Sequence, residues 1–226
     1  MADLGENQIL EWLEKKFKPS RDVKMGIGED CAVVRIGREE VTLKTDSMVE
    51  GRHFLREHPS RWVGWKAMAR PLSDFAAVGA EPKWAMIAIS LPRNLTRSYF
   101  LGLYGGVKRC AEEYGVEIVG GETSECPDRI VMSVVVVGQG GNCRRKSSRE
   151  NDAIVVTGEL GGSYKTGKHL RFRPRIREAK WLTRNYEITS MMDISDGLAI
   201  DLPRLVVRED FGFCVSLERI PVRKGF

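Results

Sequence analysis

The sequence predicts an α/β or α+β fold, in which strands and helices alternate along the chain. The segment Ile130–Val137 is apolar except for Ser133, which is typical of a buried strand. The segment Trp62–Val78 instead repeats its apolar residues at helical spacing. Segments of both kinds recur over the 226 residues and are separated by glycine, proline and polar turns, so neither element alone accounts for the chain.

Residues 1–140 form the first of two predicted domains, a mixed sheet with flanking helices. An amphipathic helix is predicted near the N-terminus, around Ile9 and Leu13, and Thr96 and Gly115 are suited to begin and end a later helix. Pro71 should kink or restart the helix that contains it. The predicted elements after the first helix are the strands Cys31–Ile36 and Val41–Thr45, the helix Trp62–Val78, the strand Met86–Leu91, the helix Thr96–Tyr114, and the strands Val116–Val119 and Ile130–Val137.

A polar, basic and glycine-containing stretch from Gln139 to Asn151 marks the predicted domain boundary. Beyond it, residues 150–226 are predicted to form a second α/β domain. Its elements are the strand Ala153–Thr157, the helices Arg175–Arg184 and Ser195–Val207, and the strand Phe213–Leu217.

Composition argues against several classes of protein. With 42% hydrophobic and 30% charged residues the chain resembles an ordinary globular protein, and its longest apolar stretch is too short to cross a bilayer. The five cysteines are scattered without a CxxC pair, and no HExxH pair is present, which argues against a disulfide scaffold or a zinc site. Because the N-terminus also lacks the features of a secretion signal, a cytoplasmic location is expected.

The net charge of +5 is compatible with two kinds of partner. Basic residues gather at 144–149 and 168–180, and the second segment contains Phe172 and Trp181, so a nucleic-acid-binding surface is one alternative. The other is an anionic small molecule, with the basic segments mainly solvated. The sequence favours the second alternative.

Several acidic residues stand beside a glycine, at a strand end or within an apolar segment. Each of them has an ordinary alternative as a cap or turn residue. Together they indicate an oxygen-rich site for magnesium, because a carboxylate near the core is costly unless it is paired or bound to a cation. A magnesium–polyphosphate site favours phosphoryl transfer, for which positioning and electrostatics suffice without a protein nucleophile. These residues are Asp30, Asp46, Asp74, Glu122, Asp193 and Asp196.

A near-match to the phosphate-binding loop occurs at residues 162–169. His169 stands where that loop needs a hydroxyl, and Pro174 interrupts the helix that should follow. A tight glycine turn is therefore the preferred interpretation. No GxSxG motif offers a competing nucleophile.

Five motifs in order resemble the thiamine-monophosphate kinase family, which shares a superfamily with aminoimidazole ribonucleotide synthetase and selenophosphate synthetase. They are Gly-Ile-Gly-Glu-Asp-Cys-Ala (26–32), Lys-Thr-Asp-Ser-Met-Val-Glu-Gly-Arg-His-Phe (44–54), Leu-Ser-Asp-Phe-Ala-Ala-Val-Gly-Ala (72–80), Val-Gly-Gly-Glu-Thr (119–123) and Met-Asp-Ile-Ser-Asp-Gly-Leu (192–198). The resemblance implies direct transfer of a phosphate from ATP to thiamine monophosphate. It also implies a homodimer in which the N-terminal domains build a shared barrel.

The resemblance further implies roles for individual residues. Magnesium ligands are expected at Asp30, Thr45, Asp46, Asp74, Glu122, Asp193 and Asp196. ATP is expected to contact Tyr104, Gly121, Glu122, Arg145 and Ser195. The thiamine phosphate is expected to meet His53.

The chain departs from the family pattern at several positions. Glu29 and Glu122 stand where the family commonly has aspartate, and Pro71 where it usually has asparagine. Lys44 stands where a small hydroxyl residue near a metal is common, so its side chain should either point away or displace a cation. The chain also stops before a further family motif, so a shortened second domain is expected. Two alternatives therefore stay open beside an active kinase: a nucleotide-binding remnant without activity, and another ATP-using member of the superfamily.

Overall fold

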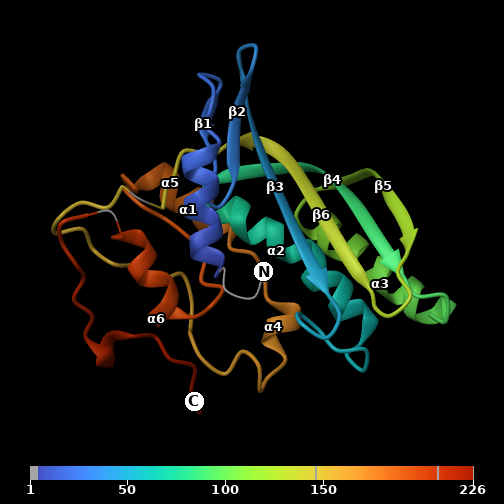
Figure 1. Cartoon of the computed structure of the whole chain (residues 1–226). Coiled ribbons are helices and arrows are strands. Elements are labelled where there is room, and N and C mark those ends of the chain that lie inside the picture. The colour runs from blue at the N-terminus through green and yellow to red at the C-terminus, as the bar shows by residue number, and fades with distance from the viewer. Residues whose placement is uncertain (1–4, 146, 208, 226) are drawn as a thin grey trace.

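A six-stranded mixed sheet forms the centre of the molecule (Figure 1). The computed structural model describes residues 5–145, 147–207 and 209–225. The sheet order is β1-β2-β3-β6-β4-β5, and neighbours run antiparallel except β4 and β5, which are parallel. This confirms the predicted mixed sheet. The strands are β1 (Val23–Met25), β2 (Ala32–Ile36), β3 (Glu39–Val49), β4 (Ala80–Leu91), β5 (Glu117–Glu125) and β6 (Val131–Gly140).

Two long helices, α2 (Ser60–Ala77) and α3 (Arg97–Glu113), lie on one side of the sheet (Figure 1). The helix α2 packs against β3, β6 and β4, while α3 packs mainly against α2. Glycines allow the two helices to approach closely. A Cβ on Gly64 would lie 1.9 Å from the carbonyl oxygen of Leu103, and one on Gly106 would lie 1.9 Å from that of Arg61. Any larger residue at these crossing points must therefore push the helices apart.

Side-chain alternation gives the sheet one buried face and one open face. In β4, Ile87 and Ile89 are buried under the helices, whereas Trp84 and Met86 remain 45% and 43% exposed on the other side. The strand β6 alternates in the same way. The open face therefore carries apolar side chains that the described part of the chain leaves uncovered.

The helix boundaries follow the predicted signals, with one difference at Pro71. The Thr96 hydroxyl accepts a hydrogen bond from the Tyr99 N–H at 3.2 Å and caps α3, and Gly115 follows the helix at a φ of 67°. The helix α2 runs through Pro71 without a break. Because proline lacks an N–H, only the hydrogen bond to the Ala67 carbonyl is forfeited there.

The chain after residue 145 forms three short helices, of which the first two pack against α2. They are α4 (Lys168–Arg171), α5 (Ile176–Asn185) and α6 (Leu198–Asp201), accompanied by 3-10 turns at Leu202–Leu205 and Leu217–Arg219. Trp65 Nε1 donates to the Phe172 carbonyl at 2.8 Å, and the Tyr114 hydroxyl donates to the Pro174 carbonyl at 3.1 Å. These bonds attach Phe172 to α2 and Pro174 to the C-terminal end of α3.

Three predicted elements of this segment are wrong. The segments 153–157 and 213–217 contain no strand, and Ile154 and Val155 are 50% and 73% exposed instead of packed in a sheet. An apolar run forms a strand only beside a partner, and none lies next to either segment in the described residues. The helix expected over 195–207 is limited to α6, because Gly197 adopts a φ of 105° before it and Pro203 follows in a 3-10 turn.

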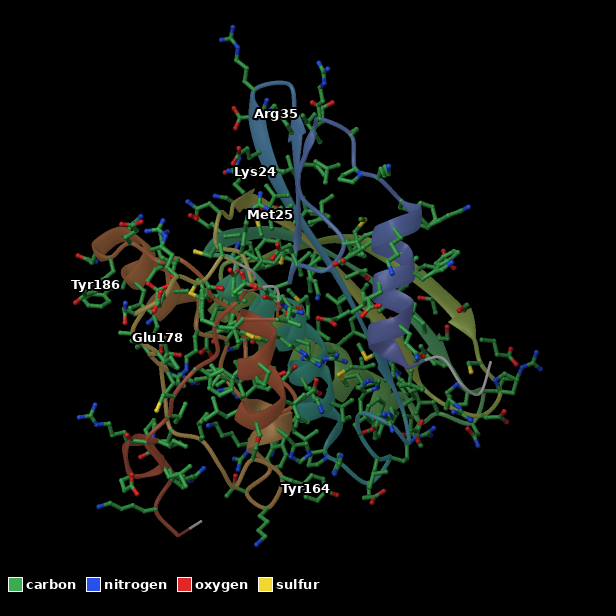
Figure 2. All side chains as sticks on the ribbon, turned by 60° about the vertical axis from the view of Figure 1, so that its left-hand side comes forward. Lys24, Met25, Arg35, Tyr164, Glu178 and Tyr186 are labelled. Carbon is green, nitrogen blue, oxygen red and sulfur yellow. The ribbon has the colours of Figure 1, made fainter. Side chains whose placement is uncertain are left out.

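The strands β2 and β3 form a hairpin that extends beyond the rest of the sheet, with Arg35 near its far end (Figure 2). The short strand β1, which the sequence did not predict, pairs with β2 and buries Met25. In Figure 2, Tyr186 and Glu178 mark α5 at the side of the molecule. Among the described helices, none is both long and apolar enough for a membrane span.

Candidate metal and nucleotide site

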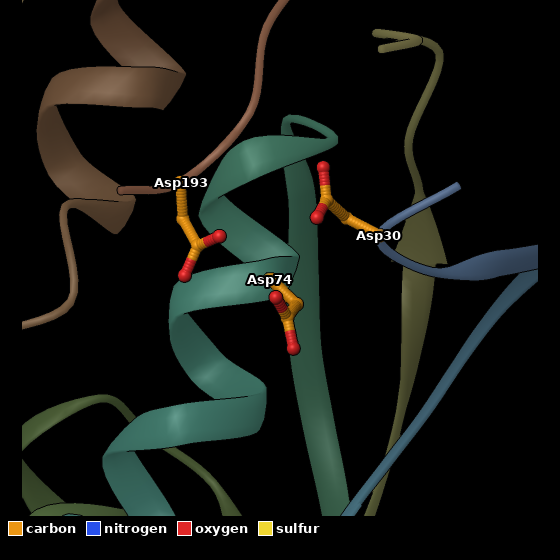
Figure 3. A group of neighbouring side chains, drawn as sticks. All are labelled: Asp30, Asp74 and Asp193. Carbon is orange, nitrogen blue, oxygen red and sulfur yellow. The ribbon is translucent and has the colours of Figure 1, made fainter. Parts of the chain in front are cut away.

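Three carboxylates from distant parts of the chain meet at one place (Figure 3). Asp30 lies two residues before β2, Asp74 lies in the C-terminal half of α2, and Asp193 lies in the loop before α6. One oxygen of each lies within 4.8 Å of the others. Asp30 and Asp74 are only 2% and 7% exposed. We call these residues the three-aspartate cluster.

The cluster is partly neutralised by protein groups. Lys44 Nζ lies 2.8 Å from Asp74 Oδ2, so this lysine points towards the acids and not away from them. The Arg145 guanidinium pairs with Asp30 Oδ1. The Ser73 hydroxyl donates to Asp193 Oδ2 at 3.1 Å. Asp30 Oδ2, however, is buried and has no hydrogen-bond partner among the described residues.

Two acids of the cluster, Asp74 and Asp193, resist ionisation. Burial, reinforced by Asp193 and Asp46 and opposed by Lys44, raises the pKa of Asp74 to about 9. Burial and the charge of Asp30 raise the pKa of Asp193 to about 6. A divalent cation would oppose both shifts, because it stabilises the ionised carboxylates. The unpartnered oxygen and the all-oxygen donor set therefore fit magnesium.

Two further predicted ligands lie on β3. Asp46 shares the α2-facing side of the strand with Lys44, and its Oδ1 lies 3.4 Å from Arg70. Its negative charge also acts on Asp74. Thr45 is exposed on the opposite side of the strand, so its side chain is not directed at the cluster. The structure thus places Asp46 beside the cluster and the Thr45 side chain away from it.

The residues predicted to contact ATP near β5 lie outside the three-aspartate cluster. Glu122 is exposed on β5, opposite Ala88 of β4. Gly121 has a packing role of its own, since a Cβ there would lie 2.0 Å from the Ile87 carbonyl oxygen. Tyr104 of α3 lines an open pocket between that helix and β5, together with Leu101, Val116 and Ile118. The structure brings Tyr104 to an apolar surface beside β5.

The loop with Ser195 and Asp196 is organised by a residue that the sequence analysis missed. Asp201 is 1% exposed, and its Oδ2 accepts hydrogen bonds from the N–H groups of Ser195, Asp196 and Gly197 at 2.9, 2.8 and 3.0 Å. Its Oδ1 accepts from Arg204 at 2.7 Å. Asp196 is directed to Arg204 as well, at 3.0 Å, and is not part of the three-aspartate cluster. An acid within the apolar run Leu-Ala-Ile-Asp-Leu was the signal available in the sequence.

His53, the predicted substrate contact, lies in the turn after β3. Its Nδ1 accepts a hydrogen bond from the Val49 N–H at 3.0 Å, and its carbonyl accepts one from Lys66 at 2.8 Å. Burial, followed by the charge of Arg70, lowers the pKa of His53. A neutral ring with Nδ1 occupied carries its hydrogen on Nε2. The substrate-binding role of His53 remains a prediction.

The near-match to a phosphate-binding loop does not build one. Residues 162–167 form turns that lead into the single turn of α4, and the described residues 147–161 before them contain no strand. Lys168 Nζ donates to the Glu159 carbonyl at 3.0 Å. The basic segments are also engaged within the chain: Arg149 pairs with Glu187 and Lys180 with Glu81, while Lys146 lies outside the described residues. These pairings favour solvated, locally satisfied segments over a nucleic-acid-binding surface.

Comparisons with known proteins agree on one family. The model of the N-terminal domain of AIR synthase related proteins matches residues 28–139. A thiamine-monophosphate kinase of Rhodopirellula baltica is 33% identical over 97% of this chain and 72% of its own length. The Aquifex aeolicus enzyme of the same name is 33% identical over 98% and 76%.

Solved structures give the same result. The structure described as AaThiL complexed with AMPPCP and TMP has a TM-score of 0.83 and 35% identity, covering 92% of this chain and 71% of that one. A HypE–HypF complex has a TM-score of 0.76 at 21% identity, which shows a shared fold only. With relatives at 33% identity over more than two thirds of their length, the chain belongs to the thiamine-monophosphate kinase family.

Proposed function

We propose that the chain transfers a phosphate group from ATP to thiamine monophosphate, giving thiamine diphosphate, and that it requires magnesium. The convergence of Asp30, Asp74 and Asp193 carries the proposal, because two buried carboxylates and a half-buried one need a cation, and a nucleotide polyphosphate needs the same one. The solved relative that holds an ATP analogue and TMP supports the choice of substrates.

The residues of the cluster have distinct roles in this proposal. Asp30, Asp74 and Asp193 would hold magnesium, which neutralises polyphosphate charge when bound. Asp46, Thr45, Glu122 and Asp196 remain proposed ligands, of which Asp46 lies beside the cluster. Arg145 pairs with Asp30 and adds positive charge beside the place where the phosphates are expected. The transfer is direct and in line, so no covalent nucleophile is assigned.

The remaining proposed contacts to ATP and to the thiamine phosphate come from residues outside the three-aspartate cluster. Asp201 holds the loop that presents Ser195, which is proposed to donate a hydrogen bond to the nucleotide phosphates. Tyr104, Gly121 and Glu122 are proposed to contact ATP near β5, and His53 the thiamine phosphate.

We also propose a homodimer and two domains. The open face of the sheet carries Trp84 and Met86, and the edge strand β5 is exposed along its whole length. Such a face and edge are costly in water, and a second copy of the sheet would cover both. The proposed division lies between residues 1–140 and 150–226, where β6 ends and the irregular segment begins.

The test is an assay of thiamine diphosphate formation from ATP, Mg²⁺ and thiamine monophosphate. Asp74→Asn should lower kcat by about 10²–10³, the usual effect of removing one group that stabilises transition-state charge. The exposed Asp128 supplies the matched control, and Asp128→Asn should retain full activity. A nucleotide-binding remnant predicts ATP binding without product, and that result from the unaltered chain would refute the proposal. A phosphorylated protein intermediate would refute direct transfer.

A further inference from the structure

The side chain of Lys44 lies inside an acidic environment. Lys44 stands opposite Val136 in the β3–β6 pair, and its side chain, 21% exposed, reaches towards α2. Its Nζ lies 2.8 Å from Asp74 Oδ2. Asp46 is on the same face of β3, two residues further along. Lys44 therefore faces one carboxylate directly and a second one at close range.

Asp74 also lies beside two other acids. Its carboxylate meets Asp30 and Asp193, with one oxygen of each of the three lying within 4.8 Å of the others (Figure 3). The Asp30 side chain is 1% exposed, and its Oδ2 lacks a partner in the described part of the chain. The unpartnered carboxylate oxygen thus belongs to Asp30, whereas Asp74 Oδ2 is already paired with Lys44.

We propose that Lys44 is a positioning residue that permanently occupies one cation position of the acidic site. Divalent cations then bind on the Asp30–Asp193 side, and one fewer is needed than an uncompensated cluster would require. The inference rests on the proposed function, since it assumes that this cluster is the metal site. It also goes beyond that function, because it assigns to a lysine side chain the neutralisation of a carboxylate that a metal ion would otherwise neutralise.

The physical reason lies in what an ammonium group can and cannot do. A charged lysine has only donors, so it satisfies Asp74 Oδ2 but cannot bind a metal itself. A divalent cation brought to the same oxygen would meet both the ammonium charge and its hydrogens. The lysine therefore directs the metal to the remaining oxygens and weakens its binding there by charge repulsion.

The experiment is a titration of the purified full chain with Mn²⁺, in which free Mn²⁺ is measured by electron paramagnetic resonance. Lys44→Met removes the charge but keeps the bulk, and it should tighten Mn²⁺ binding by at least about tenfold. Lys44→Ala also opens space and should bind one further Mn²⁺ per chain. Unchanged affinity in the first variant, together with unchanged stoichiometry in the second, would overturn the proposal.

Thermal unfolding gives a second readout, which also covers variants too unstable for titration. Without divalent cations Lys44→Met should unfold at a lower temperature than the unaltered chain, and Mn²⁺ should raise its Tm by more than it raises that of the unaltered chain. Lys66→Met is the matched control. Lys66 is also partly buried but donates to the His53 carbonyl, so its loss should not increase the Mn²⁺ effect. An equal Mn²⁺ effect on all three proteins would contradict the inference.

Asp30→Asn separates the inference from the proposed function. If the unaltered chain binds Mn²⁺ and Asp30→Asn abolishes it, while Lys44→Met changes nothing, the metal site stands and the role of Lys44 is refuted. If neither the unaltered chain nor the Lys44 variants bind Mn²⁺, the metal site itself is refuted, and the inference with it.

Discussion

The buried carboxylate of Asp201 gives the sharpest test of how the candidate site is held together. Replacing it with asparagine keeps the size of the side chain and removes its charge. Asp201 Oδ2 accepts three backbone N–H groups, from Ser195, Asp196 and Gly197, and Oδ1 accepts from Arg204. An asparagine presents a single acceptor oxygen, so either the amides or the guanidinium must face an NH₂ group.

The expected cost follows from these contacts. A hydrogen bond to a charged group contributes about 1.5–3 kcal/mol, and contacts to one carboxylate are not additive. Breaking a buried charge pair from one side costs about 3–5 kcal/mol. The Arg204 side chain is 30% exposed and can be partly rehydrated, which favours the lower end, about 3 kcal/mol. Such a loss is a large fraction of the stability of an ordinary domain.

Two measurements apply, because the loop can open without global unfolding. Hydrogen exchange at the amides of residues 195–197 should accelerate by about a hundredfold, the equivalent of roughly 3 kcal/mol. Urea denaturation shows whether the loss extends to the whole molecule. Asp196→Asn is the control: it breaks a more exposed pair with Arg204 and should cost less than about 1 kcal/mol. Exchange rates in Asp201→Asn that match those of the unaltered chain would show that Asp201 does not hold the loop.

Two other predictions concern stability. Gly106→Ala should destabilise the chain by about 1–3 kcal/mol through overpacking at the α2–α3 crossing. Gly105→Ala is the control and should not destabilise the chain, because a Cβ at Gly105 would meet nothing within 4 Å. Equal midpoints of urea denaturation for the two variants would refute the argument. Burial opposes ionisation of Glu50, but hydrogen bonds from Arg56 and the Ile130 N–H hold its pKa below the ordinary value. The ionised Glu50 therefore stabilises the folded chain above its unfolded-state pKa, and this stabilisation is lost as the pH falls through the pKa of the folded state. Glu50→Gln should make the free energy of unfolding depend less on pH below about pH 5. A pH dependence parallel to that of the unaltered chain would contradict this.

The members of the three-aspartate cluster could be predicted individually, because an acidic residue in an apolar segment indicates a functional or paired carboxylate. Asp30 and Asp74 stand in apolar surroundings in the sequence, and a carboxylate there needs compensation wherever the chain folds. Their convergence with Asp193 could not be read from local pattern, since it depends on how β2, α2 and the loop before α6 pack together. The partners Lys44 and Arg145 were likewise visible as residues but not as ion pairs.

The strands also show that local sequence pattern does not determine long-range pairing. The run Ile130–Val137 and the run Ala153–Thr157 are both apolar and rich in valine or isoleucine. The first became β6 because β3 and β4 lie on either side of it, and the second remained irregular with Val155 exposed. Periodicity records the preference of a segment for extended backbone, whereas a strand requires hydrogen bonds to a neighbour that the segment does not specify.

The charge balance of the cluster links its geometry to its proposed ligands. When all three carboxylates are ionised, they face two cationic side chains, Lys44 and Arg145, which leaves one negative charge without a partner. Burial is the first cause of the raised pKa values of Asp74 and Asp193, and the charges of neighbouring carboxylates add to it. A single divalent cation would convert the deficit into one excess positive charge, which a polyphosphate can satisfy. A site balanced in this way retains little charge of its own until cation and nucleotide arrive together.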